Sequence, residues 1–331
     1  MKKWIKEQLN DRSHTIPILT FPSAQLLNVS VNELVHSAIL QAEGMKLISE
    51  RCPMSASLTM MDLSLEAEAF GSKIKFSDDE VPTVVGHILN DIEDANKLVV
   101  PPVGTKRTKE SLRAVEIAKG LITDRPIFAG VTGPFSLAGR LMDMTEIMVN
   151  CYIDPDYVHI TLEKVTEFLI NYINEFKSRG ANGVLMAEPA AGLLSDDLCD
   201  EFSTAYVKKI KEAVDDDDFI FIYHNCGNVI PLIDSILSIN ADCYHFGNAI
   251  DISEVLEKIS SDVVVMGNID PVSEFCYGTT ESIKEKTLKL LELSKKYPNF
   301  IVSSGCDIPA KSSWDNIDSY FEVVKEFYKR G

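Results

Sequence analysis

The sequence lacks several features that would place it in a membrane, on nucleic acid or in a secretory route. Its 32 lysines and arginines stand against 50 aspartates and glutamates, a formal net charge of −18. No basic surface for nucleic acid or anionic lipid is therefore expected. No stretch approaches 18 consecutive apolar residues, and the N-terminal segment MKKWIKEQLNDR has no apolar core. Neither a membrane span nor a signal peptide is predicted.

The cysteines also lack the pattern of a disulfide framework. There are seven, an odd number at irregular spacing, whereas disulfide-rich secreted domains carry paired cysteines. We expect reduced thiols and a cytoplasmic location. Because cysteine is among the most often buried residue types, five are interpreted as core residues: Cys52, Cys151, Cys199, Cys243 and Cys276.

Short apolar runs, most of them followed by Gly, Pro or Asn, recur along the chain. They predict eight strands: Ile16–Phe21, Lys46–Glu50, Pro126–Val131, Gly183–Glu188, Phe219–His224, Asp242–Phe246, Val263–Gly267 and Phe300–Ser303. Stretches of helical spacing separate them, for example Tyr157–Arg179, Asp197–Val214, Ile252–Ser260, Ser282–Lys296 and Trp314–Tyr328.

Strands that alternate with helices imply a parallel sheet, and eight such units imply a closed (β/α)8 TIM barrel of the α/β class. A length of 331 residues and 45% hydrophobic content suit one such domain over residues 1–331. A doubly wound sheet is the alternative, but no GxGxxG follows the first predicted strand. The interval Cys52–Thr123 is too long for one strand–helix unit and is predicted to be an N-terminal, largely helical insertion over the barrel mouth.

In barrels of this class the chemistry lies at the carboxyl ends of the strands. His224 and Cys226 follow the fifth predicted strand, and Cys306 follows the eighth. One imidazole nitrogen and two thiolates suit tetrahedral Zn²⁺, and three protein ligands leave a fourth position open. The alternative is that all three are core residues. That interpretation would require three unrelated core residues to fall by chance at strand ends on the same rim of the barrel. The sequence therefore favours a zinc site.

Four other polar residues at these strand ends are candidate catalytic residues. Glu188 is expected to fill the open metal position at rest or to lie beside the metal, unless it only caps the next turn. His245 is expected to support the ligands or line the pocket. Asn268 and Asp270 are expected either to be polar pocket residues at the mouth or to form the turn into the next helix.

The ligand set also bears on the type of reaction. Two thiolates neutralise most of the charge of zinc, which makes the ion a weaker Lewis acid for hydrolysis. Zinc in such a site can still bind an incoming thiol and lower its pKa, so that the sulfur is a nucleophile near neutral pH. Alkyl transfer to sulfur is therefore favoured over hydrolysis.

Six segments carry a resemblance to a known family: Leu65–Gly71, Ala129–Leu137, Asp154–Val158, His224–Asn228, Met266–Pro271 and Ser304–Pro309. With them the chain resembles, over nearly its whole length, the uroporphyrinogen decarboxylase superfamily. Within it the chain looks like the zinc-dependent methylcobamide:thiol methyltransferases. The resemblance implies a (β/α)8 barrel and a metal motif of His-x-Cys followed by a distant Cys. That motif falls on His224, Cys226 and Cys306.

The resemblance further implies transfer of a methyl group between a methylcorrinoid and a thiol such as coenzyme M. No Asp-x-His-x-x-Gly segment is present, so a separate corrinoid protein is expected to dock over the mouth. Arg140 and Lys311 are candidates to pair with a sulfonate, although each could be an ordinary surface charge.

The sequence differs in some features from the family and from related enzymes, and other functions remain alternatives. Ile16–Ser23 lacks the arginines that hold the carboxylates of a porphyrinogen, so decarboxylation is not expected. Cobalamin-independent methionine synthases share a His-x-Cys zinc site, but their Met-Cys-Tyr setting is absent. A tetrahydrofolate acceptor, a methoxy or methylamine donor, and a non-catalytic scaffold for a corrinoid protein remain alternatives.

Overall fold

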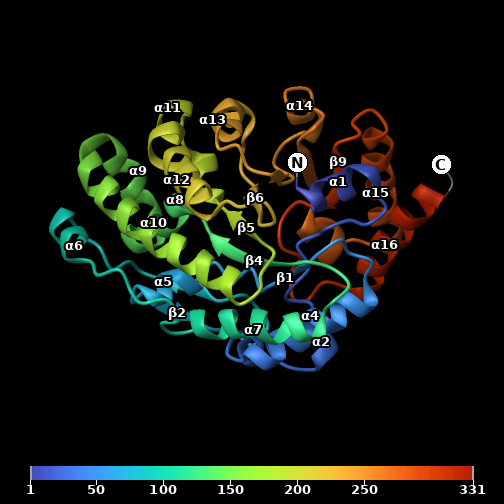
Figure 1. Ribbon diagram of the computed structural model, residues 1–331, viewed down its shortest axis with the longest axis horizontal. Coiled ribbons are helices and arrows are strands. Elements are labelled where there is room, and N and C mark those ends of the chain that lie inside the picture. Colours follow the sequence, from blue (N-terminus) through green and yellow to red (C-terminus); the bar gives the residue numbers. More distant parts are fainter. Residues whose placement is uncertain (1, 330–331) are drawn as a thin grey trace.

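A computed structural model describes residues 2–329 and confirms the barrel (Figure 1). Within these residues, seven parallel strands form one curled sheet in the order β1-β4-β5-β6-β7-β8-β9. Their bounds are β1 Ser57–Leu58, β4 Ile127–Thr132, β5 Gly183–Ala187, β6 Ile220–Asn225, β7 Cys243–Phe246, β8 Val264–Ile269 and β9 Phe300–Ser304. The six predicted strands from Pro126–Val131 onward are thereby confirmed.

The eighth position in the ring holds an extended segment, residues 15–20, in place of the predicted strand Ile16–Phe21. Thr15 forms a single parallel bridge with Met54 beside β1. Toward β9, the Ser303 hydroxyl donates to the Ile16 carbonyl at 3.0 Å, and the Ile18 amide donates to Ser304 Oγ at 2.9 Å. Side chains thus close the ring where Pro17, which has no N–H, interrupts a backbone ladder.

The predicted strand Lys46–Glu50 is wrong, because it lies inside helix α4 (Ala38–Arg51). The buried positions of this helix include Ala38, Ala42, Met45 and Ile48, which recur every three or four residues. A short apolar run in such a pattern is part of a helix. The second barrel strand is β1, which falls inside the segment that the sequence assigned to the insertion.

Helices surround the sheet (Figure 1). Those of eight residues or more are α1 Lys3–Asn10, α4, α7 Thr108–Leu121, α8 Pro134–Met142, α9 Met144–Ile153, α10 Pro155–Ser178, α12 Ala205–Val214, α15 Thr280–Ser294 and α16 Trp314–Lys329. Shorter ones are α2 Ser23–Leu27, α3 Val31–Val35, α5 Leu65–Ala69, α6 Ile92–Lys97, α11 Asp196–Cys199, α13 Ile233–Ser238 and α14 Ile252–Leu256. Among the described helices, none is both long and apolar enough to cross a membrane.

Single 3-10 or π-helical turns complete the chain: η1 Pro189–Leu193, η2 Asp200–Thr204, η3 Ile230–Leu232 and η4 Pro271–Cys276. The helices expected at Tyr157–Arg179, Asp197–Val214, Ser282–Lys296 and Trp314–Tyr328 correspond to α10, α11 with η2 and α12, α15 and α16. The helix expected at Ile252–Ser260 is shorter and ends at Leu256.

Helix α1 closes the amino end of the barrel. Trp4 packs edge-on against Phe128 of β4, with ring centroids 5.1 Å apart. Lys2 Nζ forms ion pairs of 2.8 Å with Asp215 and Asp242. Because this end is filled by side chains, a ligand reaches the strand ends only from the opposite, carboxyl side, which we call the mouth.

The insertion over the mouth is narrower than predicted and only partly helical. Residues 59–107 hold α5, α6 and an antiparallel ribbon of β2 (Lys73–Lys75) and β3 (Thr83–Val85). Helix α7, which the prediction counted with the insertion, packs on α4 as a helix of the barrel wall. Buried Arg107 holds the insertion through ion pairs with Asp62 and Glu68, the latter 2.7 Å long.

Candidate metal centre

The structure brings His224, Cys226 and Cys306 together at the mouth. One ligand atom from each lies within 4.8 Å of the others. His224 belongs to β6 and Cys226 follows that strand directly, while Cys306 follows β9 by two residues. The imidazole is buried, whereas both cysteines are partly exposed. The group is therefore accessible from the mouth on its sulfur side.

The two cysteines shift each other's pKa in opposite directions. The neighbouring Cys306 thiol, together with His224, lowers the pKa of Cys226 to about 4 against the effect of burial, and Cys226 raises the pKa of Cys306 well above its ordinary value. A lowered pKa favours the thiolate, which is the form of cysteine that binds a metal. An imidazole nitrogen and two soft sulfurs fit the tetrahedral N/S preference of zinc.

His224 presents Nε2 to the cysteines. This nitrogen lies 3.7 Å from Cys306 Sγ, whereas Nδ1 lies 2.9 Å from His245 Nδ1 and 3.2 Å from the His245 carbonyl. His245 is fully buried, and burial holds the pKa of its ring well below the ordinary value. His245 therefore lies behind His224, outside the group of ligand atoms, where it supports the ring.

Glu188 lies at the first turn of α8. Its carboxylate accepts hydrogen bonds from the Phe135 amide at 2.9 Å and the Ser136 amide at 2.6 Å. Burial raises its pKa to about 7 despite these donors. A Cβ at Gly133 would lie 2.6 Å from this carboxylate, so the glycine admits the side chain. Glu188 is not one of the three residues whose ligand atoms cluster.

Asn268 and Asp270 have the contacts of turn and loop residues. Asp270 Oδ1 accepts from the Val272 amide at 2.8 Å and the Ser273 amide at 3.0 Å, which starts η4. The Asn268 side chain donates to the carbonyls of Gly247 at 2.9 Å and Ile250 at 3.1 Å. Both line a groove of about 840 Å³ against α15, apart from the mouth cavity.

A cavity of about 930 Å³ occupies the mouth beside the metal group. It is adjacent to that group because Asp307, which lines it, directly follows Cys306. The residues that line it come from the insertion, from α8, and from the loops after β5, β8 and β9. They include Met61, Leu63, Val81, Arg140, Leu193, Tyr277, Asp307 and Lys311.

Arg140 and Lys311 differ in their partners. Burial lowers the pKa of Arg140, whose guanidinium donates to the Ser136 carbonyl at 3.0 Å. Within residues 2–329, no carboxylate lies at ion-pair distance from Arg140. Lys311, in contrast, forms an ion pair with Asp79 at the exposed rim. Arg140 is therefore the cation of the mouth cavity that is available to an anionic ligand.

Sequence reasoning missed three residues that build this site. Asn225, between the two ligands of the His-x-Cys motif, donates to the Glu188 carbonyl at 2.7 Å and accepts from the Gly227 amide at 2.8 Å. Ser303 contacts His245 Nε2 at 2.9 Å. Asp307 accepts from the Thr20 hydroxyl at 3.0 Å. In the sequence, Asn225 and Asp307 could have been identified only by their position next to His224, Cys226 or Cys306. Nothing in the sequence indicated Ser303.

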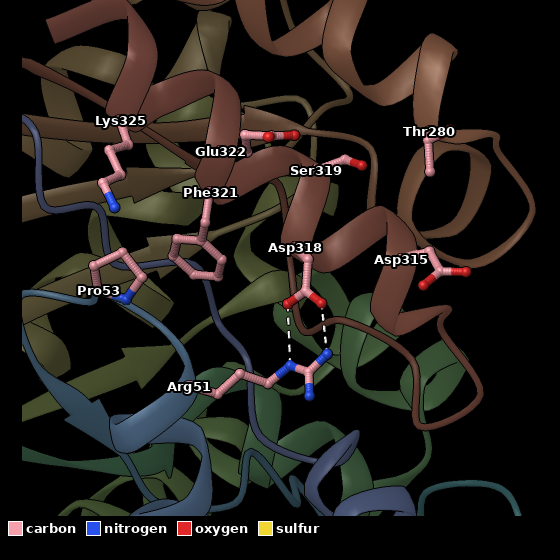
Figure 2. A pocket seen from close by; sticks show the side chains of 9 residues that line it. All are labelled: Arg51, Pro53, Thr280, Asp315, Asp318, Ser319, Phe321, Glu322 and Lys325. Atoms are coloured by element: carbon pink, nitrogen blue, oxygen red, sulfur yellow. Dashed lines mark hydrogen bonds and ion pairs between the residues drawn. The ribbon is translucent and has the colours of Figure 1, made fainter. Parts of the chain in front are cut away.

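A third hollow, of about 590 Å³, lies on the outer flank of the barrel (Figure 2). Arg51, at the end of α4, reaches Asp318 of α16 through two hydrogen bonds, of 3.0 and 2.5 Å. The same guanidinium lies 4.7 Å from the centroid of the Trp314 ring. None of the candidate site residues lines this hollow, so it is not part of the metal centre.

Comparison with known proteins places these residues in a family. The chain is 25% identical to the methylcobamide:CoM methyltransferase MtbA of Methanosarcina acetivorans over 80% of this chain and 78% of that protein. It is also 25% identical to a methylated-thiol--coenzyme M methyltransferase of Methanosarcina mazei over 84% of this chain and 74% of that one.

A solved structure, a methyltransferase from Methanosarcina mazei, has the same fold. It superposes with a TM-score of 0.84 at 22% identity and covers 96% of this chain and 93% of its own. The family model described as Uroporphyrinogen decarboxylase (URO-D) matches residues 11–327. This chain belongs to the uroporphyrinogen decarboxylase family.

Proposed function

We propose that the protein is a zinc-dependent methyltransferase that moves a methyl group between a methylcobamide, carried by a separate corrinoid protein, and a thiol. The convergence of one imidazole nitrogen and two cysteine sulfurs on the open end of the barrel is the observation that carries the proposal. Relatives that are named as methylcobamide:CoM and methylated-thiol--coenzyme M methyltransferases support it. Decarboxylation is disfavoured because the segment Ile16–Ser23 has no arginine.

His224, Cys226 and Cys306 would hold the zinc. A zinc ion bound there would supply affinity for the substrate sulfur and keep that sulfur deprotonated near neutral pH. The chain contributes a rigid base for this chemistry, since β6 and β9 carry the ligands and His245 supports the His224 ring. The partial exposure of both cysteines leaves the sulfur side open to the mouth cavity.

Arg140 would bind an anionic group on the acceptor thiol. A partly buried guanidinium with no carboxylate at ion-pair distance can bind a sulfonate or carboxylate, because a charge-assisted hydrogen bond offsets the cost of removing both groups from water. In this proposal Glu188 organises the first turn of α8, the helix that carries Arg140. Its role is then to position that helix beside the metal centre.

The rim of the mouth cavity would receive the corrinoid protein. Three apolar side chains from separate loops line the cavity and are largely exposed: Tyr277 at 81%, Leu193 at 63% and Val81 at 41%. Exposed apolar groups that converge on one opening are typical of a protein-binding surface. Asn268 and Asp270 would contribute indirectly, because they fix the loops after β7 and β8.

Demethylation of free methylcobalamin tests the reaction. With zinc present, we expect anionic and neutral thiols to accept the methyl group and metal-free protein to be inactive. Product analysis should show the methyl thioether and reduced cobalamin in equal amounts. Transfer to tetrahydrofolate but to no thiol would replace the thiol acceptor in the proposal. Zinc-loaded protein that fails to demethylate methylcobalamin with any of these acceptors would favour the scaffold alternative.

Zinc analysis tests the ligand set. We expect about one zinc per chain in the unmodified protein and well under half of that in Cys226→Ala and Cys306→Ala, because two remaining ligands bind zinc weakly. Cys276→Ala is the matched control, since this cysteine lines the mouth cavity outside the metal group. Full zinc content in both ligand variants would exclude the assignment.

Kinetics of Arg140→Met test the anion site. Loss of a charged hydrogen bond worth about 1.5–3 kcal/mol should raise KM for a sulfonated thiol by roughly 10- to 100-fold. KM for 2-mercaptoethanol, which is uncharged, should change little. Lys311→Met serves as the control, because this lysine already pairs with Asp79. Equal losses with both thiols in the Arg140 variant would show a structural effect instead.

A comparison of two methyl donors tests the docking surface. We expect Tyr277→Asp to slow transfer from a methylated corrinoid protein by about tenfold or more, because a charge in a protein interface is costly to bury. Transfer from free methylcobalamin should be retained. Tyr152→Asp is the control, since Tyr152 is 72% exposed on α9 and does not line the mouth cavity. Parallel losses with both donors would count against the rim as the docking surface.

A further inference from the structure

A chain of buried hydrogen bonds runs from the backbone of residue 16 to the ring of His224. Ser303 Oγ lies 3.0 Å from the Ile16 carbonyl and 2.9 Å from His245 Nε2. His245 Nδ1 lies 2.9 Å from His224 Nδ1. The three side chains are buried on strands of one sheet, His224 on β6, His245 on the neighbouring strand β7 and Ser303 on β9. Water does not compete for these contacts.

Which atom donates in each of these hydrogen bonds can be decided by starting from Ser303. The Ser303 hydroxyl has one proton, and the Ile16 carbonyl is an acceptor only. No other described residue donates to this buried carbonyl, and a buried carbonyl without a donor costs free energy. The hydroxyl proton therefore goes to Ile16, and Ser303 Oγ accepts from His245. The proton of the His245 ring lies on Nε2.

The next link follows from the contacts of His224 Nδ1. This nitrogen lies 3.2 Å from the His245 carbonyl, which is an acceptor only. His224 Nδ1 therefore carries a proton and donates it. Its other neighbour, His245 Nδ1 at 2.9 Å, then accepts, in agreement with a His245 ring whose proton lies on Nε2 and points to Ser303.

We infer that Ser303 and His245 are positioning residues that fix the tautomer of His224, with the proton on Nδ1 and the lone pair on Nε2. That lone pair faces Cys306 Sγ at 3.7 Å, the side on which the ligand atoms cluster. Most metal-bound histidines are oriented by a carboxylate, carbonyl or water. Here a second histidine anchored by a serine has that role. The inference rests on the proposed function only in taking the Nε2 side as the metal side.

The tautomer is measurable without any metal. In protein with 15N-labelled histidine rings, two-bond nitrogen–proton correlations separate the two neutral tautomers of each of the six histidines. We expect metal-free protein to show His224 protonated on Nδ1 and His245 protonated on Nε2, with His224→Gln used for assignment. Protonation of His224 on Nε2 would overturn the inference.

Two serine variants then test the anchor. Ser303→Ala should let His245 change tautomer, so that the His224 signals become a mixture and Co²⁺ binds about tenfold more weakly. The thiolate-to-cobalt absorption bands should also weaken at equal Co²⁺ concentration. Ser304→Ala is the matched control, because Ser304 is equally buried on β9 but accepts from the Ile18 amide. Its tautomers and Co²⁺ affinity should match the unmodified protein.

Ser303→Thr keeps the hydroxyl and should restore both the tautomer and the Co²⁺ affinity. Unchanged tautomers and unchanged Co²⁺ affinity in Ser303→Ala would overturn the role of the serine. Failure of the unmodified protein to bind Co²⁺ or Zn²⁺ would sink the metal centre, while the spectra of metal-free protein would still decide the tautomer. The two proposals therefore fail in distinguishable ways.

Discussion

The common direction of the barrel strands is the constraint on which the site depends. Parallel strands end on one edge, so residues that follow different strands meet although the chain separates them. Cys226 and Cys306 come together in this way, from the ends of β6 and β9. Side chains of α1 fill the opposite end of the barrel, which leaves the mouth as the route to these two residues. The direction of the strands therefore decides which residues meet at the site.

Hydrogen-bond donors of the protein hold two acidic side chains beside this site, one of them fully buried. Glu188 is held by two amides of α8, and Asp307 by the hydroxyl of Thr20. Burial raises the pKa of both carboxyl groups. Among the described residues no carboxylate lies at ion-pair distance from Arg140, although the charges of Glu188 and Arg140 favour each other. A cation without a direct ion pair is the basis on which we propose an anionic acceptor thiol.

The ring of the barrel closes at a position where the backbone cannot complete a ladder. Pro17 interrupts the segment 15–20, and Ser303 and Ser304 supply side-chain hydrogen bonds to it. Ser303 has a second contact, with His245. The same hydroxyl thus joins barrel closure to the support of the candidate metal ligand, which links the stability of the ring to the geometry of the site.

The sequence by itself determined the barrel class, six of its strands and the identity of the three clustered residues, because alternating apolar runs and short polar motifs are local patterns. It misplaced Lys46–Glu50, since an apolar run of that length fits a strand or a helix, and packing of α4 against α7 decides the matter. Only the tertiary structure decided the partners of Glu188, Arg140 and Ser303. The groups that bind Glu188 and Ser303 belong to residues distant in sequence. Whether Arg140 has an ion-pair partner depends on where the neighbouring carboxylates lie in the fold. No local sequence pattern gives either piece of information.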